Sequence, residues 1–296
     1  NSSTGQFKTV NDGGAPIGTW ASGGNLNQPR GYNSGAGTQT AGLAMAGYNP
    51  NVLAVTESYD GTSWTELNDL NEARSEGGGS GTQTAAIFAG GQNSGGVNNT
   101  ELWDGTNWTE VNNLNTAKDN VQNTIGLYNA ALFAGGYIPG SSARSAQTES
   151  WNGTSWTEVN DLNAAKRDGA GVGTVYTSAL AAGGYVTAVV STNEQWNGSS
   201  WTEVNNLNTA RYQVPGTGST SAGLVIGGYT TTAVGITEDW NGNNFTEVAD
   251  LNTSRYGSGA AGTTTAGLAF GGATPSVVAS TEEWNSSSVT TKVLTD

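Results

Sequence analysis

One unit of sequence recurs along the chain and is clearest in residues 87–118, IFAGGQNSGGVNNTELWDGTNWTEVNNLNTAK. It contains an apolar run that ends in a glycine pair, two tryptophans flanking an Asp-Gly step, and a basic residue at its end. The slot of the second tryptophan recurs every 44 to 48 residues, at Trp20, Trp64, Trp108, Trp156, Trp201, Phe245 and Val289. Repetition at such a period indicates an array of one supersecondary unit, stacked or arranged in a ring.

Each unit has the pattern of four short β-strands. Asp104-Gly105 and its counterparts supply the positive φ that a tight hairpin needs, and the apolar run before the glycine pair suits a buried strand. We therefore expect one all-β domain, a six-bladed β-propeller of four-stranded blades, with six repeats over residues 31–296. The N-terminal segment, residues 1–30, should supply closing strands, with residues 6–10 and the strand at Trp20 pairing with a C-terminal strand near Val289.

These motifs resemble the kelch repeat, in which a hydrophobic strand ending in Gly-Gly precedes a spaced aromatic, a tryptophan and a basic residue. Two units show the pattern: Gly90-Gly91, Trp103, Trp108 and Lys118, and Gly227-Gly228, Trp240, Phe245 and Arg255. The gap between the two aromatics is shorter than in most kelch repeats, so the units are kelch-like. They are also similar to repeat proteins encoded by marine phages. The kelch resemblance implies an interaction module, and the phage resemblance implies a virion protein.

Composition excludes several classes of site. The chain has no Cys and no His, which removes the usual zinc ligands, a thiol nucleophile, a Ser-His pair, disulfides and histidine-bound haem. We expect no cofactor and no metal. A net charge of −14 argues against nucleic acid as a partner, and no apolar run reaches the roughly 20 residues that membrane insertion requires.

Charged residues recur with the repeat and should form a ring of ion pairs that ties the blades together. A glutamate lies seven residues before each slot after the first: Glu57, Glu101, Glu149, Glu194, Glu238 and Glu282. A basic residue lies ten residues after the slot: Arg30, Arg74, Lys118, Lys166, Arg211 and Arg255. An active site normally interrupts a repeat, so these groups are interpreted as structural.

The aromatic slot has two interpretations. Trp64, Trp108, Trp156 and Trp201 could form platforms on which sugars stack. Their strict spacing, together with the replacement by Phe245 in one unit, favours packing between blades.

Strand alternation predicts which face binds a ligand. In antiparallel blades, the loops after the second and fourth strands share one face, called here the loop face. The hairpins after the first and third strands share the other, the turn face. The hairpins look alike from blade to blade, whereas the loops vary, and variable loops on a rigid scaffold usually carry recognition. The loop face should hold Tyr48, Tyr137, Arg144, Tyr185 and Tyr229, with Tyr32, Tyr212 and Tyr256 nearby.

These features predict a non-enzymatic binding or structural propeller, displayed on a virion, as a tail fibre or capsid decoration, or on a cell surface. Its partner would be a protein of that assembly or a glycan. One alternative is a lectin with repeated sugar sites. Another is a glycoside hydrolase of the sialidase kind, because SYDGTSW, residues 58–64, resembles the sialidase Asp-box but is one residue short.

Overall fold

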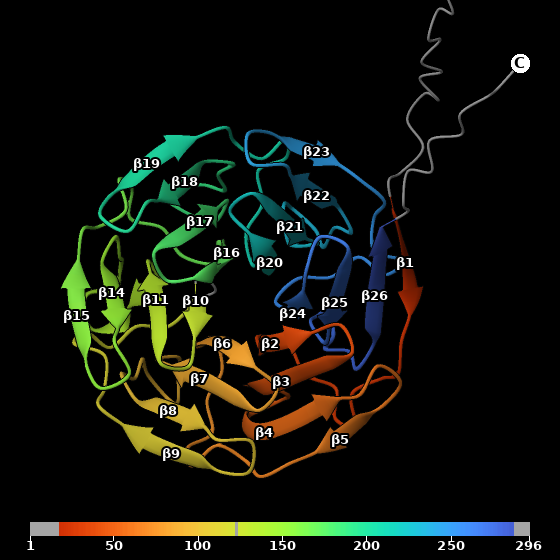
Figure 1. The fold of residues 1–296 in the computed structure, drawn as a ribbon, viewed down its shortest axis with the longest axis horizontal. Coiled ribbons are helices and arrows are strands. Elements are labelled where there is room, and N and C mark those ends of the chain that lie inside the picture. The colour runs from red at the N-terminus through yellow and green to blue at the C-terminus, as the bar shows by residue number, and fades with distance from the viewer. Residues whose placement is uncertain (1–17, 122–123, 287–296) are drawn as a thin grey trace, which may run out of the picture.

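The computed structural model describes residues 18–121 and 124–286 and shows six four-stranded antiparallel sheets around a central axis (Figure 1). Blades 1 to 3 comprise β2 (Ser34–Thr38), β3 (Ala41–Tyr48), β4 (Val52–Tyr59) and β5 (Trp64–Glu66); β6 (Gly78–Thr82), β7 (Ala85–Ala89), β8 (Thr100–Trp103) and β9 (Trp108–Val111); and β10 (Thr124–Leu127), β11 (Ala130–Ala134), β14 (Thr148–Trp151) and β15 (Trp156–Val159). Blades 4 to 6 comprise β16 (Ala170–Val175), β17 (Ser178–Ala182), β18 (Asn193–Trp196) and β19 (Trp201–Val204); β20 (Gly216–Ser219), β21 (Ala222–Ile226), β22 (Thr237–Trp240) and β23 (Phe245–Glu247); and β24 (Gly259–Gly262), β25 (Ala266–Phe270), β26 (Thr281–Ser286) and β1 (Gly18–Ser22). A two-stranded hairpin, β12 (Tyr137–Ile138) and β13 (Ala143–Arg144), flanks the 3₁₀ turn η1 (Pro139–Ser141) in the longest loop.

The N-terminal strand closes the ring. β1 pairs with β26 as the outermost strand of blade 6, and Trp20 lies opposite Trp284. Trp20 therefore fills the aromatic slot of this blade, and its partner strand centres on Trp284. Val289 and residues 6–10, which the sequence also assigned to the closure, lie outside the described residues.

The Asp-Gly and Asn-Gly steps form the outer hairpins. In blade 2, Trp103 and Trp108 face each other across the turn, and Gly105 has a φ of +94°. The Asp104 carboxylate accepts hydrogen bonds from the backbone N–H groups of Thr106 and Asn107 at 2.8 and 2.7 Å. These bonds hold the pKa of Asp104 below its usual range.

The innermost strands explain the glycine-rich segments. A Cβ on Gly35 would lie 2.2 Å from the carbonyl oxygen of Ala260 in the neighbouring blade, so only glycine permits this approach. Apolar clusters fill the spaces between the blades. One of them joins Leu43 and Met45 of blade 1 to Phe88 and Trp108 of blade 2.

The aromatic slots lie buried between the blades. Trp108 donates its indole N–H to Thr56 Oγ1 of the preceding blade at 2.9 Å. Four other tryptophans repeat this bond: Trp20 to Thr237, Trp64 to Thr281, Trp156 to Thr100 and Trp201 to Thr148. In the remaining slot Phe245 has no N–H, and the threonine position is Asn193, whose buried Oδ1 has no hydrogen-bond partner within the described protein.

The expected ion pairs are present in all six blades, and we call them the ion-pair ring. Arg74, in the connection from blade 1, contacts Glu101 on β8 at 2.8 Å. The other carboxylate oxygen of Glu101 accepts hydrogen bonds from the backbone N–H and from the side-chain amide of Asn71. Each pair thus fastens the incoming connection to the next blade. The remaining pairs are Arg30–Glu57, Lys118–Glu149, Lys166–Glu194, Arg211–Glu238 and Arg255–Glu282.

Candidate functional site

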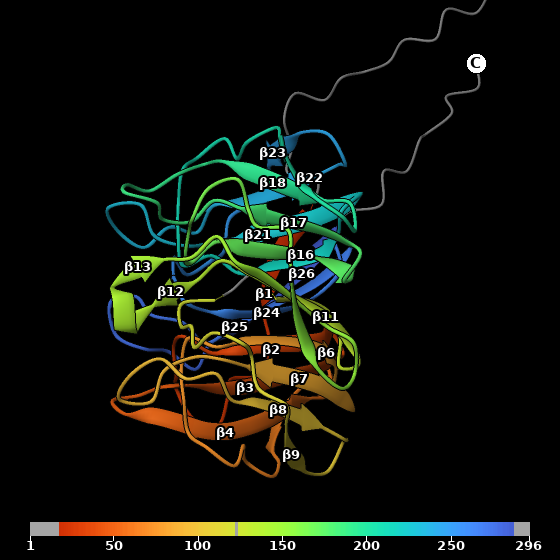
Figure 2. The same cartoon turned by 90° about the vertical axis from the view of Figure 1, so that its left-hand side faces the viewer.

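The variable loops lie on one face, as strand alternation requires. Tyr185, which begins a second-to-third-strand loop, forms a β-bridge with Arg167 of the neighbouring connection, and Tyr229 forms the equivalent bridge with Tyr212. The hairpin β12–β13 belongs to this face and projects from it, on the left in Figure 2. The loop face is therefore built from two sets of segments that pair with each other.

Six residues of this face form a closed backbone ring around the axis, which we call the mouth ring. Each lies two residues after a basic residue of the ion-pair ring, just before an innermost strand: Tyr32, Glu76, Asn120, Asp168, Gln213 and Gly257. All six have a φ between +53° and +60°. Backbone hydrogen bonds of 2.6 to 3.1 Å join each position to the next. At the blade 3 position the donor to the Glu76 carbonyl is the N–H of Val121 instead of that of Asn120. Non-glycine residues in this conformation are uncommon and cluster at functional sites.

Five tyrosines form a continuous series beside the mouth ring, the tyrosine arc. Ring centroids are 5.6 Å apart from Tyr185 to Tyr212 and from Tyr212 to Tyr229. They are 5.1 Å apart from Tyr229 to Tyr256 and 6.2 Å apart from Tyr256 to Tyr32. All five are half-buried, so they support one another instead of standing free as the loop pattern suggested.

The other three residues assigned to this face are placed differently. Tyr137 and Arg144 pair across the β12–β13 hairpin, and the Arg144 guanidinium lies over the Tyr185 ring. Tyr48 is 41% exposed and forms a β-bridge with Gly31 in blade 1. The structure thus joins seven of the eight residues through ring or cation–π contacts, whereas Tyr48 makes none of the described ring contacts.

Sequence reasoning missed the acidic part of the site. Burial raises the pKa of Asp168 to about 8 and that of Glu76 to about 7, and it also raises the pKa of Asp119. Asp119 accepts a hydrogen bond from Asn120 at 2.6 Å, and Glu76 accepts one from Gln92 at 2.8 Å. In the sequence these groups are marked only by their departure from the repeat. Asp119 lies one residue after the basic residue of its unit, and Glu76 and Asp168 lie two residues after theirs.

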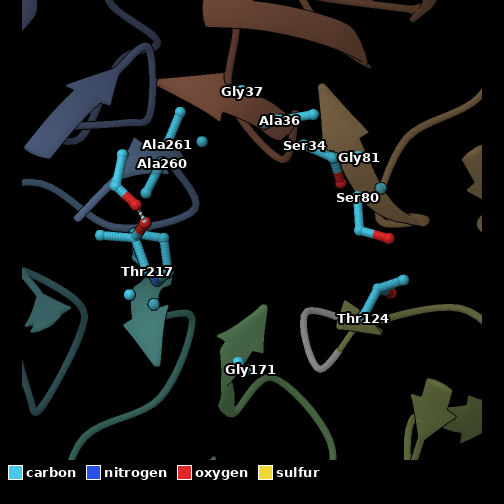
Figure 3. A pocket seen from close by; sticks show the side chains of 18 of the residues that line it. Ser34, Ala36, Gly37, Ser80, Gly81, Thr124, Gly171, Thr217, Ala260 and Ala261 are labelled. Carbon is cyan, nitrogen blue, oxygen red and sulfur yellow. Dashed lines mark hydrogen bonds between the residues drawn. The ribbon is translucent and has the colours of Figure 1, made fainter. Parts of the chain in front are cut away.

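A channel continues inward from the mouth ring. It is a cavity of about 180 Å³ lined by the six innermost strands, including Ser34, Ser80, Thr124 and Thr217 (Figure 3). The hydroxyls of Ser80, Thr124 and Ser258 are buried without a hydrogen-bond partner in the described protein. The cavity is smaller than the roughly 300–1,000 Å³ of typical ligand pockets, so a sizeable ligand would bind at the mouth.

The turn face is less uniform than its hairpin sequences suggested. Leu127 and Tyr128 in blade 3, and Val175 and Tyr176 in blade 4, are 39 to 46% exposed on adjacent first-to-second-strand turns. In blade 2 the equivalent Gln83 donates to backbone oxygens of the preceding blade. Blades 3 and 4 therefore carry an apolar patch that distinguishes them from blade 2, although the hairpins were expected to look alike from blade to blade.

Residues 18–121 and 124–286 contain no group of three or more acidic side chains arranged to hold a metal ion. In the same ranges, no helix is long and apolar enough to cross a membrane.

Comparison with solved structures places the chain among six-bladed all-β propellers with four-stranded blades. The structure of YjhT superposes with a TM-score of 0.74 over 88% of this chain and 96% of that one, at 11% sequence identity. This similarity confirms the predicted fold and, at that identity, shows the fold alone. No family model matches the sequence, and no curated protein matches it.

Proposed function

We propose that this chain is a non-enzymatic binding propeller that recognises a glycan or a protein through the mouth of its loop face. The tyrosine arc carries the proposal. In a molecule whose structural positions repeat six times, five tyrosines meet at one end of the axis and occupy blades 4, 5, 6 and 1 only. Tyrosine combines a large contact area with a polar tip and low conformational entropy, which suits recognition.

The arrangement favours one asymmetric site over the repeated sites of a lectin. The side chains that could repeat, the tryptophans, are buried between blades and are not available as six platforms. The side chains at the equivalent loop-face positions differ from blade to blade. Blade 2 has the buried Ser75 and the half-buried Gln92 where blade 5 has the half-buried Tyr212 and Tyr229. We therefore propose one ligand per chain.

Display on a virion or a cell surface is the second part of the proposal and rests on composition and on the resemblance to phage repeat proteins. Detection of the chain in purified particles or in a surface fraction would support it, and a strictly intracellular location would contradict it.

The test of the binding face compares two variants of one chain. Tyr212→Ser/Tyr229→Ser should weaken binding on a glycan array or to a surface-protein panel by about tenfold or more, as the loss of central aromatic contacts does. Tyr176→Ser, on the turn face, is the matched control. Melting curves should show both variants folded. If Tyr176→Ser abolishes binding and the double variant does not, the turn face is the recognition surface.

A further inference from the structure

The described residues contain eight cationic side chains, and six of them are paired with glutamates in the ion-pair ring. The other two, Arg144 and Arg167, lie against the same aromatic ring. Their guanidinium carbons are 5.2 and 5.3 Å from the centroid of Tyr185, at one end of the tyrosine arc. Two like charges held on one ring in a chain of net charge −14 repel each other, so an anion between or beside them would be stabilised.

The guanidinium of Arg144 makes no hydrogen bond within the described protein. None of the described carboxylates lies within 4.0 Å of it, and its Nε is shielded from solvent without a hydrogen-bond partner. Arginine carries five N–H donors in a planar fork. The β12–β13 hairpin therefore holds a guanidinium at the mouth whose Nη donors are not used by the described protein.

Arg167 is oriented more firmly. Its guanidinium lies between the rings of Tyr137 and Tyr185, at 5.5 and 5.3 Å, and its side chain is 30% exposed. Only Nη1 contacts polar atoms of the described protein, Asn120 Oδ1 and Asp168 Oδ2, both at 3.3 Å. Because burial raises the pKa of Asp168 to about 8, this carboxyl is largely protonated near neutral pH and neutralises Arg167 incompletely.

We propose that Arg144 and Arg167 form a carboxylate-binding site, and that the ligand of the loop face is a carboxylated sugar of the uronic-acid class. This inference rests on the proposed binding function. A guanidinium fork pairs with a planar carboxylate through two parallel hydrogen bonds. The adjoining tyrosine arc supplies apolar faces on which the C–H side of a sugar ring packs.

The acidic surroundings favour a carboxylate over a phosphate ester. Glu76 interacts electrostatically with Asp119 and Arg167, and Asp119 with Arg167, so the ionised forms of these two carboxyls repel a second negative charge on a ligand. A singly charged planar anion meets less repulsion from these groups than a phosphate dianion does.

The experiment uses oligogalacturonate, with its methyl ester as the uncharged match, and measures binding to the full chain by calorimetry. The acid should bind at least about tenfold more tightly than the ester, the effect of one charge-assisted contact. Arg144→Gln and Arg167→Gln should each remove this preference, and Arg144→Lys should restore part of it. Tyr176→Ser should bind as the unaltered chain does, and melting curves show that each variant is folded.

Three outcomes would overturn the inference. Equal affinity for the acid and for the ester shows that the arginines do not bind the carboxylate. Arginine-dependent binding of a sulfated oligosaccharide as tight as that of the uronate shows an unselective anion site. Binding of neutral glycans alone, lost in Tyr212→Ser/Tyr229→Ser, removes the carboxylate site and leaves the proposed function standing. Failure of that proposed function appears separately, as ligand binding that survives every loop-face variant.

Discussion

The ion-pair ring and the mouth ring lie two residues apart in every repeat, yet they differ completely in composition. The ion-pair ring has an Arg or Lys at each of its six basic positions, and every one has a fully buried side chain paired with glutamate. The mouth ring has six different residues at positions whose φ angles agree within 7°. The backbone is thus repeated in both rings, and the side chains are repeated in only one.

The reason lies in what holds each ring. In the ion-pair ring the side chains make the contacts, because Glu101 binds both Arg74 and the backbone of Asn71. In the mouth ring the contacts run from amide to carbonyl, as from the Gln213 N–H to the Asp168 oxygen at 2.7 Å. Side chains there are free to vary without loss of the ring. Variation inside the repeat therefore marks positions whose side chains do not hold the ring together.

The largest effect should follow from breaking the ion-pair ring. Glu101→Ala leaves Arg74 buried without its counter-charge and should lower the free energy of unfolding by about 3–5 kcal/mol. Chemical denaturation measures this. Arg74→Met/Glu101→Leu removes both charges and should recover much of the loss. A single variant as stable as the original chain would show that the pair does not hold the connection.

A smaller effect should appear in the pH dependence of the mouth ring. The pKa of Asp168 is about 8 in the folded chain and about 3.9 when unfolded, so the folded state binds more protons between these values. Stability should therefore fall as pH rises from 5 to 8. The side chain of Asp168→Asn cannot ionise, so this variant should lose about 1–3 kcal/mol less of its free energy of unfolding between pH 5 and pH 8. Chemical denaturation at both pH values measures the difference.

Asp104→Asn is the control for this experiment, because the pKa of the exposed Asp104 is lowered and its contribution changes only in acid. An unaltered slope in Asp168→Asn would show that this carboxyl titrates normally.

The smallest effect should come from Gln213→Gly. Glycine relieves the cost of about 1 kcal/mol that a side chain incurs at a φ of +53°, and it loses a similar amount of conformational entropy. The free energy of unfolding should change by less than about 0.5 kcal/mol, as thermal denaturation can measure. Arg211→Ala, two residues earlier, should destabilise the chain strongly. A large loss in Gln213→Gly would mean that mouth-ring side chains also carry the fold.

The repeat predicted the blade count, the ion pairs and the loop face because each follows from spacing alone. It placed the tyrosines on one face but did not predict their order or the ring contacts that join them in the tyrosine arc. Tyr212 and Tyr256 lie one residue after the basic position, whereas Tyr32 lies two residues after it. The left-handed backbone of the mouth ring is what brings Tyr32 into contact with Tyr256 despite this difference of one residue. Arg167 and Asp168 were visible as departures from the repeat, but their contacts depend on neighbouring blades.

The closure of the ring by β1 has a consequence for the order in which the chain folds. β1 is the first described strand to be synthesised, and its partner β26 is the last. Until β26 exists, the sixth sheet cannot be completed, and blades 1 and 5 each leave a side without a neighbour. Long-range pairings of this kind form slowly and expose unpaired strand edges in the meantime. An open ring that meets a second open ring can exchange its first strand with it, so dilution favours closed single rings over strand-exchanged assemblies.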